Sequence, residues 1–467
     1  MSDLQSYFLC GIGGSGMLPL AMILQAQGHR VEGSDRALDQ GRNAPKFDYL
    51  RNRGIVLHAQ DGSGISSASQ ILVASTAVEE TVPDIVAARK VGCRCTSRAE
   101  MLASLFNGSA RPIGVAGTSG KSTVTGMIAW ILHAAGQEPT VMNGAVMNNF
   151  TGADEPFASA LVGCGGDFVS EVDESDGSIE YYNPTVAILT NISEDHKSMD
   201  ELRTLFQDFL GRADQAVLNA DNLETLQIRQ GAAPEGHTWF SLVDDAADLY
   251  ASNLAPAADG IAFTLQAKTG ATVIPVELQV PGVHNVANAL AAIGAAITCN
   301  ISIEDATHFL GGFTGLHRRL EMVGTAYGVT VIDDFGHNPD KIAATLKTLH
   351  AFPGRLLVMF QPHGYGPLRN MRRGFVETFS TQLRSEDVLL MPEPVYYGGT
   401  TVKDISSRDI TTALVANGIH AEAYNARADC GVRLISLAKP GDRIVIMGAR
   451  DDTLADFARD LLYRIGP

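Results

Sequence analysis

Residues 113–123 read Ile-Gly-Val-Ala-Gly-Thr-Ser-Gly-Lys-Ser-Thr. The apolar residues at the start of this stretch indicate a strand, and residues 124–135 have the pattern of a helix. A glycine-rich loop between a strand and a helix is the context in which many proteins bind phosphate groups. The stretch therefore predicts an α/β domain with a nucleotide at the loop.

The residue types of this loop suit a nucleoside triphosphate. Gly117 and Gly120 allow backbone N–H groups to turn toward an anion, and Lys121 adds a positive charge. Ser122 offers a hydroxyl to a magnesium ion. The loop is shorter than the Walker pattern requires, and a Gly-Lys-Ser step can also be a solvated loop before a helix. With the strand and the helix in place, nucleotide binding is the better interpretation, and ATP is the expected nucleotide.

Composition limits the remaining possibilities. A chain of 467 residues is too long for one ordinary core, so we expect two or three domains. The formal net charge of −17 argues against a general role on nucleic acid or on a membrane surface. We expect no membrane-spanning helix, because no apolar segment is long enough. We also expect no signal peptide, because residues 7–10 already indicate a strand. Six scattered cysteines fit a reducing compartment, so we expect a cytoplasmic protein. We also expect either a monomer or a homodimer.

Strand-like and helix-like segments alternate along nearly the whole chain, which favours an α/β architecture with mostly parallel sheets. We expect a Rossmann-like domain in residues 1–107, a central phosphate-loop domain in 108–314 and a second Rossmann-like domain in 315–467. Short β-like runs within 244–280 indicate an antiparallel insertion in the central domain. Residues 107–112 read Asn-Gly-Ser-Ala-Arg-Pro and predict a linker between the first two domains. The third domain is expected to open with a strand near residue 329.

The first domain begins with a second glycine-rich turn. Gly11, Gly13 and Gly16 match Gly-x-Gly-x-x-Gly after a predicted strand, and Asp35 stands where an acidic residue would bind a ribose. Such a turn brings a pyrophosphate to the N-terminus of a helix. NAD is the simplest interpretation, but another diphosphate ligand would use the same contacts. A tight turn without any ligand is the alternative.

Polar residues end two strands that follow the phosphate loop. Residues 170–177 read Ser-Glu-Val-Asp-Glu-Ser-Asp-Gly, and residues 190–196 read Thr-Asn-Ile-Ser-Glu-Asp-His. Carboxylates at strand ends beside a phosphate loop suit Mg²⁺, either directly or through water. A solvated acidic loop and an aspartate that caps a helix are the alternatives. Two such strand ends after one phosphate loop favour the metal site, although a hydrolase would show the same pattern.

Later motifs add possible nucleotide contacts. Asn285 and Asn288 lie three residues apart, hence on one face of a predicted helix, where their amides can recognise an adenine edge. The arginines at 318–319 can stabilise the charge that builds up in phosphoryl transfer, or they can be a surface pair. Residues 333–339 read Asp-Asp-Phe-Gly-His-Asn-Pro after a further strand, and residues 360–365 read Phe-Gln-Pro-His-Gly-Tyr.

In this order the motifs resemble those of the Mur ligase superfamily, whose members join carboxylates to amines at the expense of ATP. The resemblance covers essentially the whole chain and is greatest to the alanine-adding branch and to a related peptide-adding branch. It implies that the first domain binds UDP rather than NAD, that the second binds ATP and that the third brings the amine. The implied reaction activates the carboxylate of UDP-N-acetylmuramate as an acyl-phosphate, with Mg²⁺, in peptidoglycan synthesis.

The resemblance also implies roles for single residues. The catalytic residues would be Lys121, Glu171, His196 and Arg319, and Mg²⁺ would be held by Ser122, Glu171 and His196. The remaining contacts would be, for ATP, Gly117, Thr118, Ser119, Gly120, Lys121, Ser122, Thr123, Asn285, Asn288, Arg319 and Asp334; for the UDP substrate, Gly11, Gly13, Gly14, Ser15, Gly16, Asp35 and Ser75; and for the amine, His337 and Tyr365.

The chain departs from the family pattern at two places. Gly364 and Pro367 stand where alanine-adding members carry arginines that bind the carboxylate of the amino acid, and Arg369 is the nearest arginine. A guanidinium binds a carboxylate through two hydrogen bonds, which neither glycine nor proline can replace. Some relatives also carry a carbamylated lysine that binds a second metal, and no lysine occurs between residues 198 and 267.

Three alternatives to an alanine-adding ligase therefore remain. The first is a ligase whose acceptor is a peptide or an amine without an α-carboxylate, or whose donor belongs to a specialised pathway outside the cell wall. The second is a non-catalytic nucleotide-binding homologue, which is less favoured because Lys121, Glu171 and His196 are all present. The third is an NAD dehydrogenase, for which nothing outside the first domain provides support.

Overall fold

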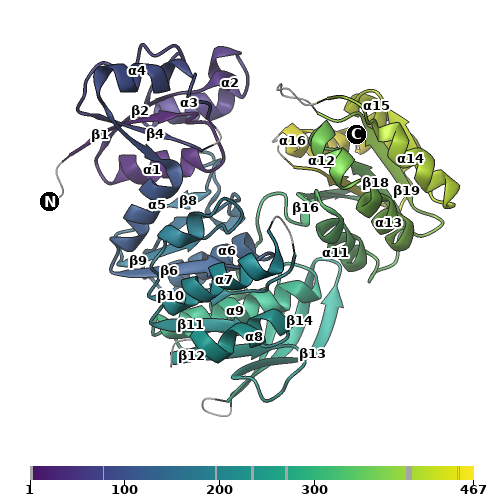
Figure 1. Cartoon of the computed structure of the whole chain (residues 1–467). Helices are drawn as coiled ribbons and strands as arrows, with labels where there is room; N and C mark the ends of the chain where they lie inside the picture. Colours follow the sequence, from purple (N-terminus) through teal and green to yellow (C-terminus); the bar gives the residue numbers. More distant parts are fainter. Residues whose placement is uncertain are drawn as a thin grey trace. The chain divides into compact units, whose positions relative to one another are not determined.

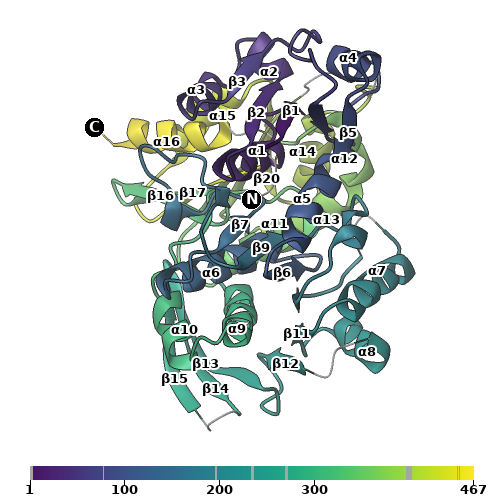
Figure 2. The same cartoon turned by 90° about the vertical axis from the view of Figure 1, so that its left-hand side faces the viewer.

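The computed structural model describes residues 4–76, 78–194, 197–232, 236–268, 272–395, 402–449, 451 and 453–466. The chain forms two compact units, one made of Met1–Leu254, Ala262–Leu278 and His284–Thr314, and the other of Ala255–Ile261, Gln279–Val283 and Gly315–Pro467. The first unit contains two sheets and the second contains one (Figures 1 and 2). The prediction of an α/β architecture with mostly parallel sheets is confirmed, and the described residues form three sheets. In the described part of the chain, no helix has the length and apolarity that a membrane span requires.

The N-terminal sheet has five strands in the order β3-β2-β1-β4-β5, all parallel. Side chains alternate along β1 because successive residues of a strand point to opposite faces. Tyr7 and Leu9 join the core under α1 and α3, whereas Phe8 and Cys10 join the core under α4. The elements are β1 Ser6–Cys10, α1 Met17–Ala26, β2 Arg30–Ser34, α2 Arg36–Asp39, α3 Ala44–Asn52, β3 Val56–His58, β4 Gln70–Ala74, α4 Pro83–Val91, β5 Arg94–Ser97 and α5 Arg98–Asn107.

The central sheet has ten strands in the order β15-β14-β13-β12-β11-β10-β6-β9-β7-β8. Strand β6, which leads into the phosphate loop, lies between β10 and β9 and is parallel to both. The loops that follow these three strands therefore meet at one edge of the sheet, where α/β proteins bind their ligands. The elements are β6 Arg111–Ala116, α6 Lys121–Ala134, β7 Thr140–Met142, η1 Asn148–Phe150, β8 Ala160–Leu161, β9 Asp167–Glu171, η2 Ser178–Tyr181, β10 Val186–Leu189, α7 Met199–Gly211, β11 Gln215–Asn219, α8 Leu223–Ala232, β12 Gly236–Ser241, β13 Leu249–Ala257, β14 Gly260–Ala267, β15 Thr272–Leu278, α9 Val283–Thr298 and α10 Ile303–Leu310.

Helices cover both faces of the central sheet (Figure 2). Ala216 and Leu218 of β11 join the core under α7 and α8, while Val217 faces the opposite way and touches α9 at Gly294. A Cβ on Gly294 would lie 2.7 Å from Val217, so the helix approaches the sheet more closely than alanine would allow. The insertion predicted within 244–280 forms strands β13, β14 and β15 at one end of this sheet.

The linker predicted at 107–112 is shorter than expected. Asn107 ends α5 and Arg111 begins β6, so three residues lie between the two elements. Arg111 is held in the strand by a double hydrogen bond from its guanidinium to Asp167, and the carbonyl of Pro112 accepts a hydrogen bond from the N–H of Thr185. Proline indicated a break because it lacks an N–H, but near the start of a strand this loss is tolerated.

The C-terminal sheet has six strands in the order β16-β17-β21-β18-β19-β20. All pairs are parallel except β16 with β17, and β16 is an edge strand that the sequence did not indicate because its residues are only partly buried. The elements are β16 Glu321–Ala326, β17 Val329–Asp334, α11 Pro339–Leu349, β18 Leu356–Phe360, α12 Tyr365–Asn370, α13 Arg372–Gln382, β19 Val388–Pro392, α14 Ser407–Ala416, β20 His420–Tyr424, α15 Arg427–Leu437, β21 Arg443–Met447 and α16 Thr453–Ile465.

Candidate active site

The phosphate loop joins the end of β6 to the start of α6 and requires both of its glycines. Gly117 and Gly120 have φ values of +130° and +90°, which side chains disfavour. A Cβ on Gly117 would lie 2.2 Å from the hydroxyl oxygen of Thr190, and one on Gly120 would lie 2.6 Å from Oδ1 of Asn288. The loop is also tied to the next strand end, because the N–H groups of Thr118 and Ser119 donate to Asn191.

The loop leaves a row of backbone donors open. The first backbone hydrogen bond of α6 runs from the N–H of Val124 to the carbonyl of Gly120. The preceding N–H groups, from Gly120 to Thr123, find no acceptor among the residues that the structure describes. Open N–H groups at the start of a helix are suited to a phosphate chain, because both the donors and the helix dipole favour an anion there.

Lys121 is largely enclosed by a group of carboxylates. Its Nζ donates to the carbonyl oxygen of Gly117 at 2.7 Å and to Oε2 of Glu174 at 2.8 Å. Burial alone lowers the pKa of Lys121, but the charges of Glu174 and Glu171 outweigh it and raise the pKa above the ordinary lysine value. Lys121 is therefore a fixed positive charge beside the open N–H groups, and Glu174 holds it in place.

Ser122 and Glu171 form a pair of oxygen donors at the same place. The hydroxyl of Ser122 donates to Oε2 of Glu171 at 2.8 Å, and the N–H of Gly144 donates to the same oxygen at 3.0 Å. A hydroxyl and a carboxylate beside a phosphate site are the ligands that Mg²⁺ prefers when phosphates and water complete its shell. No group of three potential metal-binding side chains occurs among the described residues. His196, the third expected ligand, lies outside the described residues.

The asparagine pair of α9 reaches the phosphate loop. Asn285 and Asn288 are both buried, and Nδ2 of Asn288 donates to Oδ1 of Asn285 at 3.0 Å. Oδ1 of Asn288 faces Gly120, as the close approach to its missing Cβ shows. The structure thus brings together the central-domain residues predicted to bind ATP.

The second glycine-rich turn follows β1. Its N–H groups at Gly11 and Ile12 donate to the carbonyl oxygen of Ser34, which fixes the turn against the end of β2. Asp35 accepts a hydrogen bond from the N–H of Gly13 at 2.9 Å and another from Ala37 at 2.8 Å, so it braces the turn and caps α2. Its predicted contact with a ribose remains a prediction.

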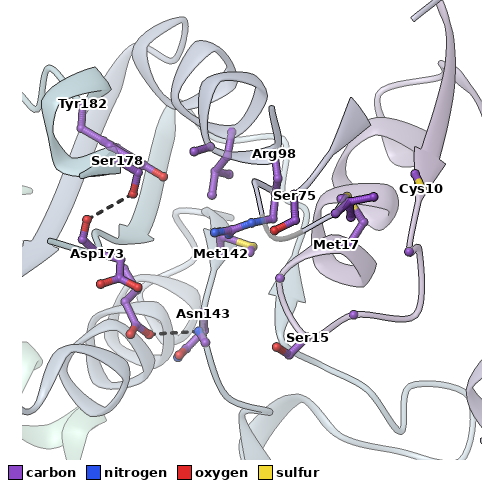
Figure 3. A pocket seen from close by; sticks show the side chains of 18 residues that line it. Cys10, Ser15, Met17, Ser75, Arg98, Met142, Asn143, Asp173, Ser178 and Tyr182 are labelled. Carbon is purple, nitrogen blue, oxygen red and sulfur yellow. Dashed lines mark hydrogen bonds between the residues drawn. The ribbon is translucent and has the colours of Figure 1, made fainter. Parts of the chain in front are cut away.

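A pocket of about 420 Å³ lies between this turn and Glu171, the carboxylate that accepts a hydrogen bond from Ser122 of the phosphate loop (Figure 3). One end is lined by Gly11, Gly14, Ser15, Gly16 and Ser75, which the sequence predicted as UDP contacts, and the other end is lined by Glu171. The sequence did not indicate several of the remaining lining residues, which come from α5, from the segment after β7 and from the acidic loop after β9. They include Arg98, Met142, Asn143, Gly144, Ser178 and Tyr182, whereas Asp173, which also lines the pocket, belongs to the acidic run 170–177 noted in the sequence.

In the C-terminal unit the two adjacent arginines have different environments. Arg318 is buried, and its guanidinium contacts the carboxylate of Asp333 at 3.2 Å and donates to the carbonyl oxygens of Gly448 and Asp451. Arg319 is partly exposed, and its guanidinium carbon lies 4.7 Å from the ring centre of Phe335. Arg318 is therefore structural, and Arg319 is the arginine that can reach a ligand.

Asp334 orders the segment after β17. Its Oδ1 accepts from the N–H of Leu320 at 3.0 Å, and its Oδ2 accepts from the N–H of Gly336 and the hydroxyl of Thr345. A carboxylate has about four positions for donors, so most of its capacity is already used. The predicted contact of Asp334 with ATP remains a prediction, and its structural role is the one that the geometry shows.

The predicted amine-site residues lie near the ends of β17 and β18. His337 packs edge-on against His363 with ring centres 5.4 Å apart, and Tyr365 is the first residue of α12. Nδ1 of His337 lies 3.0 Å from the carbonyl oxygen of Phe335, which identifies Nδ1 as the protonated nitrogen when the ring is neutral. Nε2 is then an acceptor.

Burial and the neighbouring Lys341 lower the pKa of His337 to about 3, so the ring is neutral at pH 7. The unfolded chain takes up a proton at this residue near pH 6.5 and the folded chain does not, so folding stability falls as the pH drops from 6.5 toward 3. His337→Gln should remove about 1 kcal/mol per pH unit of this dependence. Unfolding by urea at pH 7.0, 6.0 and 5.0 measures it, and equal slopes for both proteins would contradict the assignment.

Models of known families match three successive parts of the chain. Residues 7–109 match a Mur ligase family catalytic domain, residues 115–296 a Mur ligase middle domain, and residues 318–450 a Mur ligase glutamate ligase domain. Each match contains one of the three sheets that the structure shows.

Curated relatives match over nearly the full length. The UDP-N-acetylmuramate–L-alanine ligase of Chromobacterium violaceum is 36% identical over 457 residues, which cover 94% of each chain. The enzyme of the same name from Paracoccus denitrificans is 34% identical over 97% of this chain and 95% of its own.

Solved structures have the same fold. The UDP-N-acetylmuramate–alanine ligase of Thermotoga maritima superposes with a TM-score of 0.78 at 23% identity and covers 98% of both chains. A murein peptide ligase from Psychrobacter arcticus gives a TM-score of 0.73 at 26% identity and covers 99% of both. The resemblance inferred from the motifs is confirmed, and the chain belongs to the Mur ligase family of ATP-dependent ligases.

Proposed function

We propose that the protein joins the carboxylate of UDP-N-acetylmuramate to an amino acid through an acyl-phosphate, with ATP as the source of energy and Mg²⁺ as the metal. The observation that carries this proposal is the pocket that has the glycine-rich turn at one end and Glu171 at the other. A nucleotide-sugar whose diphosphate lies at the turn would present its far end to the phosphate loop. The names of the curated relatives support the same reaction.

The chemistry needs two displacements. An oxygen of the donor carboxylate attacks the γ-phosphorus of ATP, and the bond to ADP breaks. The amine nitrogen then attacks the acyl carbon, the tetrahedral intermediate collapses, and inorganic phosphate leaves with the bonding electrons. Lys121 and the open N–H groups of the loop would hold the phosphates in line, because phosphoryl transfer depends mainly on positioning and charge.

Ser122 and Glu171 would hold Mg²⁺, which neutralises charge on the phosphate oxygens when bound. The amine must lose a proton to become a nucleophile. His337 would accept a hydrogen bond from the amine at Nε2, because its ring is neutral at pH 7 and its Nδ1 is engaged by Phe335. With a pKa of about 3 the ring is too weak a base to hold the proton, which would pass to water. With these residues the proposed enzyme needs no covalent bond to the protein.

One observation favours a second candidate acceptor. Gly364 has a φ of +139°, a conformation that an arginine side chain disfavours, and Pro367 has no polar side chain. The remaining arginine, Arg369, donates through Nε to the carboxylate of Asp404 at 2.8 Å and through Nη2 to the carbonyl oxygen of Val402. Its guanidinium is therefore already engaged, and this segment offers little to the α-carboxylate of a free amino acid. The second candidate is a ligase with a peptide or a non-α-amino-acid amine as acceptor.

A single assay separates the candidates. Purified protein is incubated with ATP, Mg²⁺, UDP-N-acetylmuramate and one amine at a time, namely L-alanine, glycine, L-serine, L-alaninamide and an L-alanyl peptide, and phosphate release is followed. We expect amine-dependent release. L-alaninamide lacks the α-carboxylate of L-alanine. If the segment at 364–369 makes no contact with that carboxylate, the two acceptors should give rates within about tenfold of each other. A bidentate contact between an arginine and the carboxylate would produce a larger preference for L-alanine. A preference of more than about a hundredfold for L-alanine would reject the second candidate.

Absence of amine-dependent release with every acceptor, despite tight ATP binding, would instead favour a non-catalytic homologue. As parts of the same proposal, we expect the enzyme to act in the cytoplasm, as a monomer or a homodimer. Light scattering coupled to gel filtration would settle the oligomeric state.

A further inference from the structure

The pocket between the glycine-rich turn and Glu171 contains one positive charge that none of the roles above uses. Arg98 is the only cationic side chain among the described residues that line the pocket, and Glu171 and Asp173 are also there. Figure 3 shows its guanidinium in the middle of the pocket, between Ser75 and Met142. A cation so placed would attract an anionic ligand.

Arg98 is poorly engaged in the structure. Its contact with the protein is the carboxylate of Asp176, at 3.5 Å, and no other hydrogen-bond partner occurs among the described residues. A guanidinium has five N–H donors, and a separation of 3.5 Å is at the outer limit of a hydrogen bond. A partly exposed pair of this kind contributes little to folding. The side chain is therefore free to change partners at a small cost.

The position of Arg98 in its helix gives a second reason to look for a ligand. It is the first residue of α5, where the helix dipole disfavours a positive charge. A residue there that served folding alone would be better as an acid, and Glu100 in the same turn fills that role in the capping box.

The guanidinium lies directly against the glycine-rich turn. A Cβ on Gly16 would lie 2.8 Å from Nη1 of Arg98, so a side chain at this place would displace the end of the arginine. The N–H groups of Ser15 and Gly16 find no acceptor among the described residues, whereas the other N–H groups of the turn are used within the protein. Two open backbone donors and a guanidinium thus converge on one end of the pocket.

We propose that Arg98 binds the diphosphate of the nucleotide-sugar donor together with the N–H groups of Ser15 and Gly16, and that it leaves Asp176 to do so. This inference rests on the proposed function, because it assigns a binding residue for that donor. A diphosphate accepts charge-assisted hydrogen bonds from several donors at once, which a guanidinium and adjacent N–H groups supply. Arg98 is then a donor-binding residue that the sequence motifs do not reveal.

The test uses UDP and UDP-N-acetylmuramate as probes in isothermal titration, with full-length wild type, Arg98→Ala, Arg98→Gln and Asp176→Asn. Arg98→Gln keeps much of the side-chain stem, in case the alanine variant folds poorly. We expect both Arg98 variants to bind the probes about 10- to 100-fold more weakly, with ATP binding unchanged. Arg89→Ala, which removes an exposed arginine paired with Glu80 outside the pocket, should bind UDP like wild type.

Asp176→Asn distinguishes a ligand contact from a structural brace. If Arg98 binds the diphosphate, removal of its competing carboxylate should leave UDP affinity unchanged or raise it by up to about fivefold. If the pair only braces the acidic loop, Asp176→Asn should weaken binding as much as Arg98→Ala, and that result would overturn the assignment. Wild-type affinity in both Arg98 variants would also overturn it. Failure of wild type to bind UDP at all would overturn the proposed function itself.

Discussion

Replacing Lys121 with alanine is expected to lower amine-dependent phosphate release by about 10³-fold or more. Lys121 is the positive charge beside the open N–H groups of the phosphate loop, and its Nζ is held by Gly117 and Glu174. Removal of a fixed charge from a phosphoryl-transfer site removes transition-state stabilisation that water cannot replace. Binding of UDP-N-acetylmuramate should persist, because its proposed contacts lie at the glycine-rich turn.

The same substitution also changes stability, and this effect must be separated from catalysis. Glu174 is buried, and without Lys121 its carboxylate would lack its partner, which costs about 3–5 kcal/mol in other buried pairs. Lys121→Ala should therefore unfold at lower urea concentration than wild type. The double variant Lys121→Ala with Glu174→Gln should regain most of this stability, since the buried side chain at 174 then carries no charge.

The double variant should remain inactive although it is stable again. Phosphate release in the presence of ATP, Mg²⁺, the donor and the best acceptor, together with urea unfolding of the same samples, gives both quantities. Activity in the double variant within about tenfold of wild type would show that Lys121 is not the phosphate-binding lysine. Lys90→Ala, which removes an exposed lysine of α4 outside the site, is the matched control and should keep most of the activity.

The sequence predicted strands correctly where an apolar run of residues belongs to a strand that is buried on both faces of its sheet. Tyr7, Phe8, Leu9 and Cys10 form an apolar run, as a parallel strand covered on both faces requires, and the structure buries them on alternate sides. Strand β16 was missed because its side chains are only partly buried, so it carries no such run. Pro112 indicated a linker from its local chemistry, whereas the hydrogen bond that places it in β6 comes from Thr185, far away in the sequence.

The site shows the same division between local and tertiary information. Gly117, Gly120 and Lys121 could be identified because they belong to one short motif of consecutive residues. Their partners could not, because Glu174 stood in the sequence as one carboxylate in an acidic run, and only the fold pairs it with Lys121. Arg98 had no motif at all, since the turn it contacts lies some 80 residues away in the chain. Asp35 was assigned to a ribose, and the fold also uses it to cap α2.

Substitutions of the adjacent residues Arg318 and Arg319 are expected to have different effects, the first on stability and the second on activity. Arg318→Ala should lower the free energy of unfolding by about 3–5 kcal/mol, because it leaves the fully buried Asp333 without its partner. Arg319→Ala should change stability by less than about 1 kcal/mol, since its side chain is partly exposed and lies over Phe335. It should instead lower turnover by about 10²-fold or more if Arg319 contacts ATP.

The loss in Arg318→Ala should also depend on pH in a defined direction. Burial raises the pKa of Asp333 to about 6, although Arg318 opposes this. Loss of the arginine should raise the pKa of Asp333 further. A carboxyl group whose pKa is higher in the folded than in the unfolded protein stabilises the folded state at low pH, and this stabilisation is lost as the pH rises through the folded-state pKa. The stability gap between wild type and variant should therefore widen from pH 6 to pH 8, as urea unfolding at both values would measure.

The double variant Arg318→Met with Asp333→Leu separates the pair from the rest of the fold. Without the buried carboxylate no unpaired charge remains, and side chains of similar volume should recover much of the lost stability. If the double variant is as unstable as Arg318→Ala, the hydrogen bonds from Arg318 to the carbonyl oxygens of Gly448 and Asp451 would be the dominant contribution instead. Equal stability losses in Arg318→Ala and Arg319→Ala would contradict the assignment of one arginine to the fold and the other to the nucleotide.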